Sequence, residues 1–471
     1  MAGKTESIHP LELIGAFALV IAICWPEGWG AQKVFLQKIW RFYFIEVIFV
    51  IICYGLVIRC LGYRIFLKRS FCPHLLRGDP IAKAIILILA IYLIYFGRAM
   101  LAGRPFKLTA NDFRAVPLML SYFVGKSLIK DFNRFRQLFL LLCLGIVFHS
   151  LITLIILPFR RTFFAPIFEE SMLEQGLRVW FRNSALFILP LPFLLAWVKF
   201  RPRLGYRKEL LVPSLTVLTL VFLVISAVIS QSRMLLFSIL LTLVPFLGTY
   251  RTLLYKHWKL ILALVILMGT LSGVIVFSQH PFMVGLRETM VERVRDTLRG
   301  EDESLMARLL TYHFNFKEAL KQPLWGHGVG AKMTTLSPYL KGEDTEFLVI
   351  DNLYITVLYK MGVIGLIAYL ILLWSIFTAT LRVYRRSEED WEKLAAFAIL
   401  SSLPSLMIYC TVTSAFLVYT SSFVIGFFTL LGGLMGCYFY GEQPVPVETR
   451  AARGGHDQNS EKQAEILVWQ P

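Results

Sequence analysis

The feature that most constrains this chain is the length of its apolar blocks. About twelve stretches, each close to the roughly 20 residues that an α-helix needs to cross a bilayer, are separated by polar loops. Hydrophobic residues make up 57% of the 471 residues, and charged residues make up only 17%. A soluble protein could not hide this much apolar surface from water, so the sequence predicts a polytopic membrane protein.

We predict an all-α fold, a polytopic bundle of about 12 transmembrane helices with a large extracytoplasmic helical loop. The expected parts are a transmembrane bundle over 1–278, a cap loop over 279–350, further spans over 351–440 and a disordered cytoplasmic tail over 441–471. The spans are expected at roughly 10–25, 40–59, 81–98, 113–130, 135–157, 180–198, 211–229, 232–249, 258–278, 352–381, 392–412 and 416–440.

The cap loop is expected to be folded, because residues 284–298 and 305–320 both carry apolar residues at helical spacing. A long ordered loop on a scaffold is a common place for function. The seven cysteines show no CxxC pairing and are interpreted as small packing residues, not as disulfides or metal ligands.

The formal net charge of +17 comes from basic residues that gather in the loops expected on the cytoplasmic side. This is the positive-inside pattern, so the charge indicates topology and gives no reason to expect nucleic acid as a partner. Both termini are then expected in the cytoplasm. Two outer loops disagree with this arrangement, since they contain Arg98, Arg104, Lys107, Arg160 and Arg161.

The short turn Gln231-Ser232-Arg233 stands between two predicted spans, with Arg233 opening the second one. An arginine at the membrane boundary is costly unless it reaches the interface or meets an anion. Its guanidinium fork suits phosphate, so Arg233, with Ser232 beside it, is a candidate binding residue. The alternative is an interfacial arginine that binds lipid headgroups or a carboxylate.

The second candidate region runs from Arg308-Leu-Leu-Thr-Tyr312 to Gln322-Pro-Leu-Trp-Gly-His-Gly-Val-Gly330. An amphipathic helix carrying Arg308 is expected to lead into a glycine-rich turn. Glycines permit tight geometry with exposed N–H groups, so the turn could bind an anion, with His327 and Gly328 as substrate-binding residues. The alternative is a plain turn with a structural or solvated histidine.

The third candidate region is Asp351-Asn352, followed after nine residues by Gly362-Val-Ile-Gly365. Asp351 is a carboxylate at the membrane boundary that could accept a proton from a hydroxyl. Alternatively, Asp and Asn are helix N-caps, and the glycines allow close packing of membrane helices. Lys360 lies nine residues after Asp351, on the opposite helix face, so we expect it to form a salt bridge within the bundle.

Taken in order, these three regions resemble the O-antigen ligase family, which also contains O-antigen and exopolysaccharide polymerases. The resemblance is firmest over about residues 230–370; the first two hundred residues match only in hydropathy. It implies a metal-independent glycosyltransferase of the bacterial inner membrane, without a cofactor. Such enzymes move a glycan from undecaprenyl pyrophosphate to an acceptor hydroxyl at the periplasmic face. The acceptor is lipid A–core in ligases and a second lipid-linked glycan in polymerases.

The resemblance also implies roles for particular residues. Arg233 and Arg308 match the arginines thought to hold the donor pyrophosphate, Asp351 would orient or deprotonate the attacking hydroxyl, and Asn352 would hold the helix start. Ligases usually carry a histidine where this chain has Asp351. That departure leaves a polymerase, or transfer to a different acceptor, open. A flippase for the same lipid-linked sugars is a further alternative, although no internal repeat is visible.

Overall fold

The computed structural model describes a subset of the chain: 78–113, 116–129, 133–140, 143, 190–200, 218, 241–242, 244, 295, 303–336, 344–347, 350–411 and 422–441. The spans predicted at 10–25, 40–59 and 258–278 lie outside the described residues. So do nearly all of 211–229, of 232–249 and of the predicted cap helix over 284–298, and the whole tail that follows residue 441.

Three of the described helices are long and apolar enough to cross a membrane: α5 (Pro80–Leu101), α15 (Leu353–Arg386) and α16 (Asp390–Tyr409). They coincide with spans predicted at 81–98, 352–381 and 392–412. Helix α17 (Ser422–Gly441) coincides with the one predicted at 416–440 and contains a shorter apolar stretch. The chain is therefore a membrane protein whose described part is mainly helical.

The span predicted over 113–130 is not one helix. The chain forms α6 (Phe106–Phe113), the 3-10 helix η1 (Val116–Leu120) and α7 (Ser121–Leu128) instead. Pro117 lies inside η1, and proline lacks the N–H that a continuous α-helix needs. Another short helix, α10 (Pro190–Phe200), overlaps the second half of the span predicted at 180–198 and begins at a proline.

The cap contains strands as well as a helix, so the all-α prediction is wrong for this part. Helix α14 (Glu303–Ala319) confirms the helical spacing seen over 305–320. It is followed by β1 (Met333–Leu336) and β2 (Asp344–Phe347), which pair antiparallel with Met333 opposite Phe347. The β-branched pair Thr334-Thr335 favours extended backbone, but a four-residue strand is too short to stand out in the sequence.

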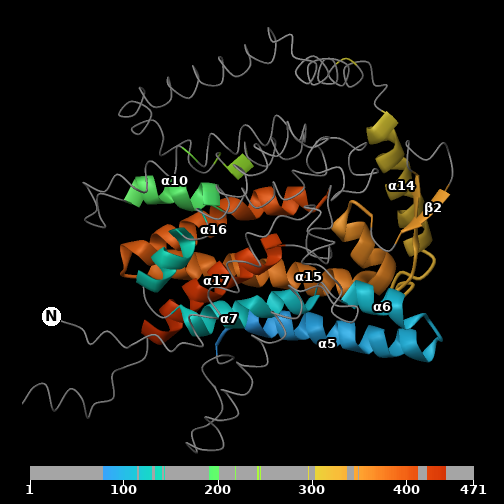
Figure 1. Ribbon diagram of the computed structural model, residues 1–471, viewed down its shortest axis with the longest axis horizontal. Coiled ribbons are helices and arrows are strands. Elements are labelled where there is room, and N and C mark those ends of the chain that lie inside the picture. Colours follow the sequence, from blue (N-terminus) through green and yellow to red (C-terminus); the bar gives the residue numbers. More distant parts are fainter. Residues whose placement is uncertain are drawn as a thin grey trace, which may run out of the picture.

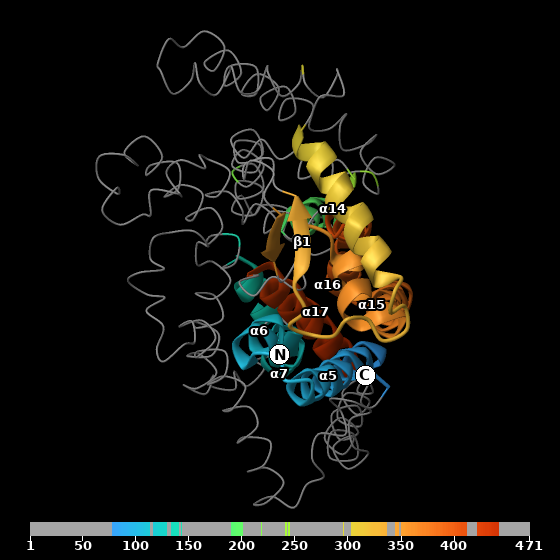
Figure 2. The ribbon, with the colours of Figure 1, turned by 90° about the vertical axis from the view of Figure 1, so that its right-hand side faces the viewer.

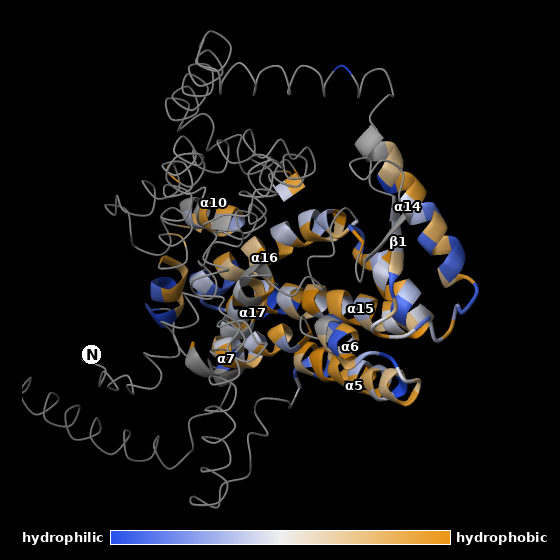
Figure 3. Cartoon of the chain, turned by 45° about the vertical axis from the view of Figure 1, so that its right-hand side comes forward, coloured by the Kyte–Doolittle hydropathy of each residue, from blue (hydrophilic) through white to orange (hydrophobic). Residues whose placement is uncertain are grey.

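The helices of the bundle lie side by side, with the cap at one end (Figure 1). Helix α14 and strand β1 stand in front when the molecule is viewed from that end (Figure 2). Coloured by hydropathy, α5 is mostly apolar, whereas α14 alternates between apolar and polar residues (Figure 3). Hereafter the end of the bundle that carries α14, β1 and α6 is called the cap end.

Helix α5 begins at an aspartate, Asp79, whose carboxylate accepts four hydrogen bonds from the protein. The carboxylate of Asp79 accepts hydrogen bonds from the backbone N–H groups of Ile81 (3.0 Å) and Ala82 (3.1 Å), which makes it the N-cap. The same carboxylate accepts the hydroxyl of Tyr122 at 2.5 Å and the ammonium of Lys126 at 2.6 Å, both from α7. This cluster fixes the start of α5 to α7 in the interior.

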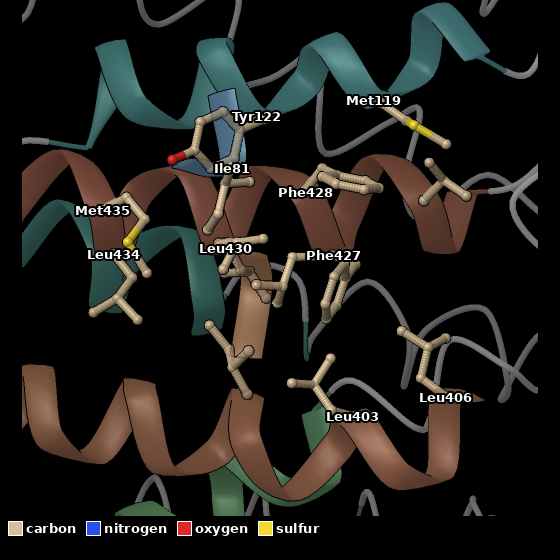
Figure 4. Close-up of a cluster of buried hydrophobic side chains, with 14 of the residues drawn as sticks. Ile81, Met119, Tyr122, Leu403, Leu406, Phe427, Phe428, Leu430, Leu434 and Met435 are labelled. Carbon is tan, nitrogen blue, oxygen red and sulfur yellow. The ribbon is translucent and has the colours of Figure 1, made fainter. Parts of the chain in front are cut away.

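Helix α7 packs against α17 through glycines. A Cβ on Gly125 would lie 2.0 Å from the carbonyl oxygen of Thr429, and one on Gly432 would lie 1.9 Å from that of Tyr122. Small residues of this kind let membrane helices approach backbone to backbone. The apolar side chains around this contact form the core shown in Figure 4, with contributions from α5, η1, α7, α16 and α17.

Helix α15 is divided at Gly362. Its 34 residues would span about 50 Å at ~1.5 Å per residue, well beyond the ~30 Å of a bilayer core. Gly362 has φ 63° and ψ −162°, a conformation that strongly favours glycine, and so breaks the helix near the end of its first third. Residues 353–361 therefore form a separate segment at the cap end, where α14 packs against α15.

Candidate active site

Arg308 and Asp351, predicted from separate motifs, lie together at the cap end. A terminal nitrogen of Arg308, on α14, is 3.8 Å from Asp351 Oδ2, just before α15. Their side chains are 45% and 54% exposed. A separation of 3.8 Å is an ion pair without a hydrogen bond, so both groups keep unused hydrogen-bonding capacity and remain accessible to a ligand.

Asn352 is the residue that caps α15. Its Oδ1 accepts the N–H of Ile355 at 2.9 Å, and its Nδ2 donates to the carbonyl of Thr411 at 2.9 Å. The backbone N–H of Leu353 donates to Cys410 O at 2.9 Å, so the start of α15 is tied to the end of α16. The capping alternative therefore belongs to Asn352, and the Asp351 carboxylate faces Arg308 instead.

Tyr312 also belongs to this site, although the sequence motif that contains it gave it no role. It lies one helical turn after Arg308, and its hydroxyl donates to the backbone carbonyl of Asp351 at 2.5 Å. Burial, together with the nearby Asp351 carboxylate, raises the pKa of Tyr312 to about 12, against an opposing effect of Arg308. The phenol is therefore a hydrogen-bond donor at neutral pH. The sequence did offer one signal for Tyr312: residues four apart on a helix lie on the same face, so a helix would make Tyr312 and Arg308 neighbours.

In the glycine-rich turn, the backbone N–H groups of His327, Gly328 and Gly330 already have acceptors within the protein. The N–H of His327 donates to Tyr359 O and that of Gly328 to Lys360 O, both at 2.7 Å. The N–H of Gly330 donates to Asp112 Oδ2 at 2.6 Å. Each of these donors is used to hold the turn against α6 and α15.

His327 and Gly328 are not brought into the Arg308–Asp351 site. The His327 ring stacks on Tyr359 with centroids 4.5 Å apart, and its Nε2 lies 2.9 Å from the carbonyl oxygen of Glu318. Tyr359 follows Asp351 by eight residues, about 12 Å along a helix. These contacts agree with the structural alternative for the histidine.

Gly326 and Gly362 allow the turn to approach α15 directly. A Cβ on Gly326 would be 2.5 Å from Gly362 N, and one on Gly362 would be 2.2 Å from Leu324 O. Beside them the N–H of Val363 donates to Pro323 O at 2.8 Å. Gly362 was expected to serve helix packing; its role is to break α15 and to receive the turn.

Lys360 forms the salt bridge within the bundle that its helical phase predicts. Its ammonium contacts the Asp112 carboxylate of α6, and both side chains are buried. Arg104 donates through Nη1 to Gly328 O (3.2 Å) and Val329 O (3.1 Å), and through Nη2 to His327 O. Its guanidinium thus holds the glycine-rich turn, which explains an arginine in a loop where the positive-inside pattern does not place one.

The other two predicted site residues, Ser232 and Arg233, lie outside the described residues. Among the described residues, the predicted catalytic pair that the structure brings together is Arg308 with Asp351, supported by Asn352 and Tyr312.

Comparison with protein families gives a match over part of the chain. Residues 218–370 match the family model described as O-antigen ligase. The match covers about a third of the chain and contains the whole of the Arg308 motif, the glycine-rich turn and the Asp351 motif. It confirms the resemblance seen in the order of these motifs. A comparison with proteins of curated function found no match.

Proposed function

We propose that this protein is a glycosyltransferase of the bacterial inner membrane. It would move a glycan from undecaprenyl pyrophosphate to an acceptor hydroxyl at the periplasmic face. The observation that carries this proposal is the exposed Arg308–Asp351 pair, which lies at the cap end within the segment that matches the O-antigen ligase family. Members of that family transfer lipid-linked glycans.

Arg308 is the proposed contact for the diphosphate of the donor. Its guanidinium is about half exposed and has one long ionic contact, so it can turn its donors toward phosphate oxygens. The start of α15 lies beside it, and a helix N-terminus also favours negative charge. Arg233 and Ser232 are proposed as further contacts to the donor, on the resemblance alone.

Asp351 is the proposed base for the acceptor. As the acceptor oxygen bonds to the anomeric carbon, the bond from that carbon to the pyrophosphate oxygen breaks, and the diphosphate leaves with the electron pair. The acceptor proton passes to the Asp351 carboxylate, while Arg308 stabilises the charge that grows on the leaving group. Tyr312 donates to the backbone carbonyl of Asp351, and Asn352 caps the helix that follows it.

A polymerase is the second candidate, favoured by one observation. Ligases of the family usually have a histidine where this chain has Asp351, and the structure places that aspartate beside Arg308. The acceptor would then be another lipid-linked glycan in place of lipid A–core. A flippase would call for charged groups at mid-membrane, whereas this pair lies at the start of a helix at the cap end.

The test is reconstitution of the full chain in liposomes with undecaprenyl-pyrophosphate oligosaccharide. Lipid A–core and a second lipid-linked glycan are supplied as acceptors in separate arms. We expect a new glycosidic bond in one arm and a loss of about 100-fold or more in Arg308→Ala. Lys317→Ala, which removes another exposed cation of α14, should keep full activity. Movement of intact donor lipid across the bilayer without product, or equal losses in the two variants, would reject the proposal.

A further inference from the structure

We propose that the buried ion pair between Asp112 and Lys360, together with Arg104, holds the glycine-rich turn, residues 322–330, on the bundle. These three residues are called the latch. Through α14, which leads into this turn, it positions Arg308 over Asp351. The role assigned to Arg308 rests on the function proposed above, whereas the existence of the latch does not.

Burial separates the latch from the substrate site. The Lys360 and Asp112 side chains are 4% and 3% exposed, whereas Arg308 and Asp351 are about half exposed. A buried ammonium is stable only beside an anion, so Lys360 needs Asp112 and is not available to a phosphate. The Asp112 carboxylate also accepts the N–H of Gly330. One aspartate of α6 therefore holds α15 and the glycine-rich turn together.

A cation and an anion from the segment between the end of α5 and the end of α6 both form hydrogen bonds with the backbone of the glycine-rich turn. Arg104, just before α6, donates to the three successive carbonyls of His327, Gly328 and Val329. Asp112, near the end of α6, accepts from the next N–H in the turn, that of Gly330. A cation on carbonyls and an anion on an N–H match the polarity of the backbone, so the turn is fixed in position and in direction.

The turn in its fixed position determines where α14 lies. His327 Nε2 contacts the Glu318 carbonyl at the end of α14, and the stacking of His327 on Tyr359 ties that end to α15. Nearer the other end, Arg308 and Tyr312 meet Asp351. A helix of 17 residues is about 25 Å long and stiff, so release of its end near the turn would shift Arg308 relative to Asp351.

The first experiment measures whether the latch holds the turn. A cysteine is introduced at Val329, which is fully buried, and its reaction with a membrane-impermeant maleimide is followed in the full chain. A cysteine at the exposed Lys332 gives the reference rate. Lys360→Met should raise labelling at position 329 about tenfold or more, because it leaves the Asp112 charge buried without its counterion. Lys360→Arg, which keeps the cation, should leave position 329 protected.

The second experiment uses rescue to separate positioning from direct catalysis. Removing both charges of a buried pair costs far less than removing one, so Asp112→Asn combined with Lys360→Met should restore protection at position 329. In the glycan-transfer assay, Lys360→Met should raise KM for the lipid-linked donor and lower kcat, on the order of 100-fold in kcat/KM. The double variant should recover to within about threefold of the wild type. A substrate contact by Lys360 itself would not be rescued by Asp112→Asn.

Three results would overturn the latch. The first is that position 329 is labelled no faster in Lys360→Met than in the wild type. The second is that the double variant is as inactive as Lys360→Met, and the third is that Lys360→Met exposes position 329 and still transfers glycan at the full rate. If wild-type protein makes no product, the proposed function fails. The labelling rates would then still decide whether the turn is latched.

Discussion

Two aspartates at the starts of two membrane helices show how burial separates a structural carboxylate from one available for chemistry. Asp79 caps α5, is fully buried and accepts four hydrogen bonds, including those of Tyr122 and Lys126. Asp351 stands one residue before the cap of α15, is 54% exposed and has Arg308 at 3.8 Å. The first carboxylate is saturated by the protein, and the second has room for a substrate.

The exposed ion pair Arg308–Asp351 and the buried ion pair Lys126–Asp79 also differ in what it costs to break them. An exposed pair contributes about 0–1 kcal/mol, so Arg308 and Asp351 can separate around a ligand at little cost. A buried pair that loses one partner costs about 3–5 kcal/mol, because the other charge stays in the interior. The region around Asp79 should therefore govern stability, whereas the Arg308–Asp351 site should govern activity.

The largest effect is expected from Asp79→Ala. It removes the cap of α5 and the carboxylate that the buried Lys126 ammonium contacts, so the free energy of unfolding should fall by about 3–5 kcal/mol. Equilibrium unfolding in detergent, followed by circular dichroism, measures this loss. Asp351→Asn is the matched control and should change stability by less than about 1 kcal/mol. Equal destabilisation of the two variants would remove the distinction between the aspartates.

Asp351→Asn should show the opposite behaviour in the transfer assay. It keeps the size of the side chain but removes the base, so kcat should fall on the order of 100-fold or more, about 2.7 kcal/mol in the activation free energy. Initial rates with reconstituted protein measure the effect. Asp351→His, which restores the residue usual in ligases, should recover part of the rate. Full activity of Asp351→Asn would show that this carboxylate is not the base.

Close packing near Asp79 predicts an intermediate effect for Gly125→Ala. The new methyl group would lie 2.0 Å from the Thr429 carbonyl oxygen, so α7 and α17 must move apart at a cost of about 1–3 kcal/mol. The control is Gly97→Ala in α5, where a Cβ meets no atom within 4 Å and alanine favours the helix. Thermal unfolding compares the two. A neutral Gly125→Ala would contradict the tight α7–α17 contact.

The smallest effect is expected from Tyr312→Phe, which removes one hydrogen bond to the Asp351 backbone. Transfer should fall by about tenfold or less. The pKa of Tyr312 is raised to about 12 in the folded protein, so the folded state favours the neutral phenol. Its contribution to stability is therefore present below about pH 10 and is lost as pH rises toward 12. Between these values the wild type should lose more stability than Tyr312→Phe, which denaturant titrations would show.

The sequence predicted features that depend on local pattern and missed those that depend on distant partners. Hydrophobic length placed the helices that begin at Pro80 and Asp390, and helical phase predicted that Lys360 forms a salt bridge inside the bundle. Its partner Asp112 was not predicted, because α6 is short and lies 248 residues away. The break at Gly362 was missed because a glycine in an apolar run also suits helix packing.

In the candidate site, too, local pattern identified the residues, but their contacts with distant parts of the chain could not be predicted. Arg308, Asp351 and Asn352 were found from residue type and motif order, but their meeting depends on how α14 folds back on α15. Tyr312 was overlooked because its hydrogen bond is to backbone, which no side-chain motif records. His327 was a candidate binding residue in the sequence, and its stacking on Tyr359 could not be predicted because the two residues lie in different motifs.

The claim that Arg308 and Asp351 form one site is tested most directly by a double-mutant cycle in the reconstituted transfer assay. The rates of Arg308→Ala, Asp351→Asn and the double variant are compared with the wild type at saturating donor. If the two side chains act on the same transition state, the double variant should be no slower than the slower single variant to within about threefold. If the two losses simply multiply, the residues act independently and the single-site account is contradicted.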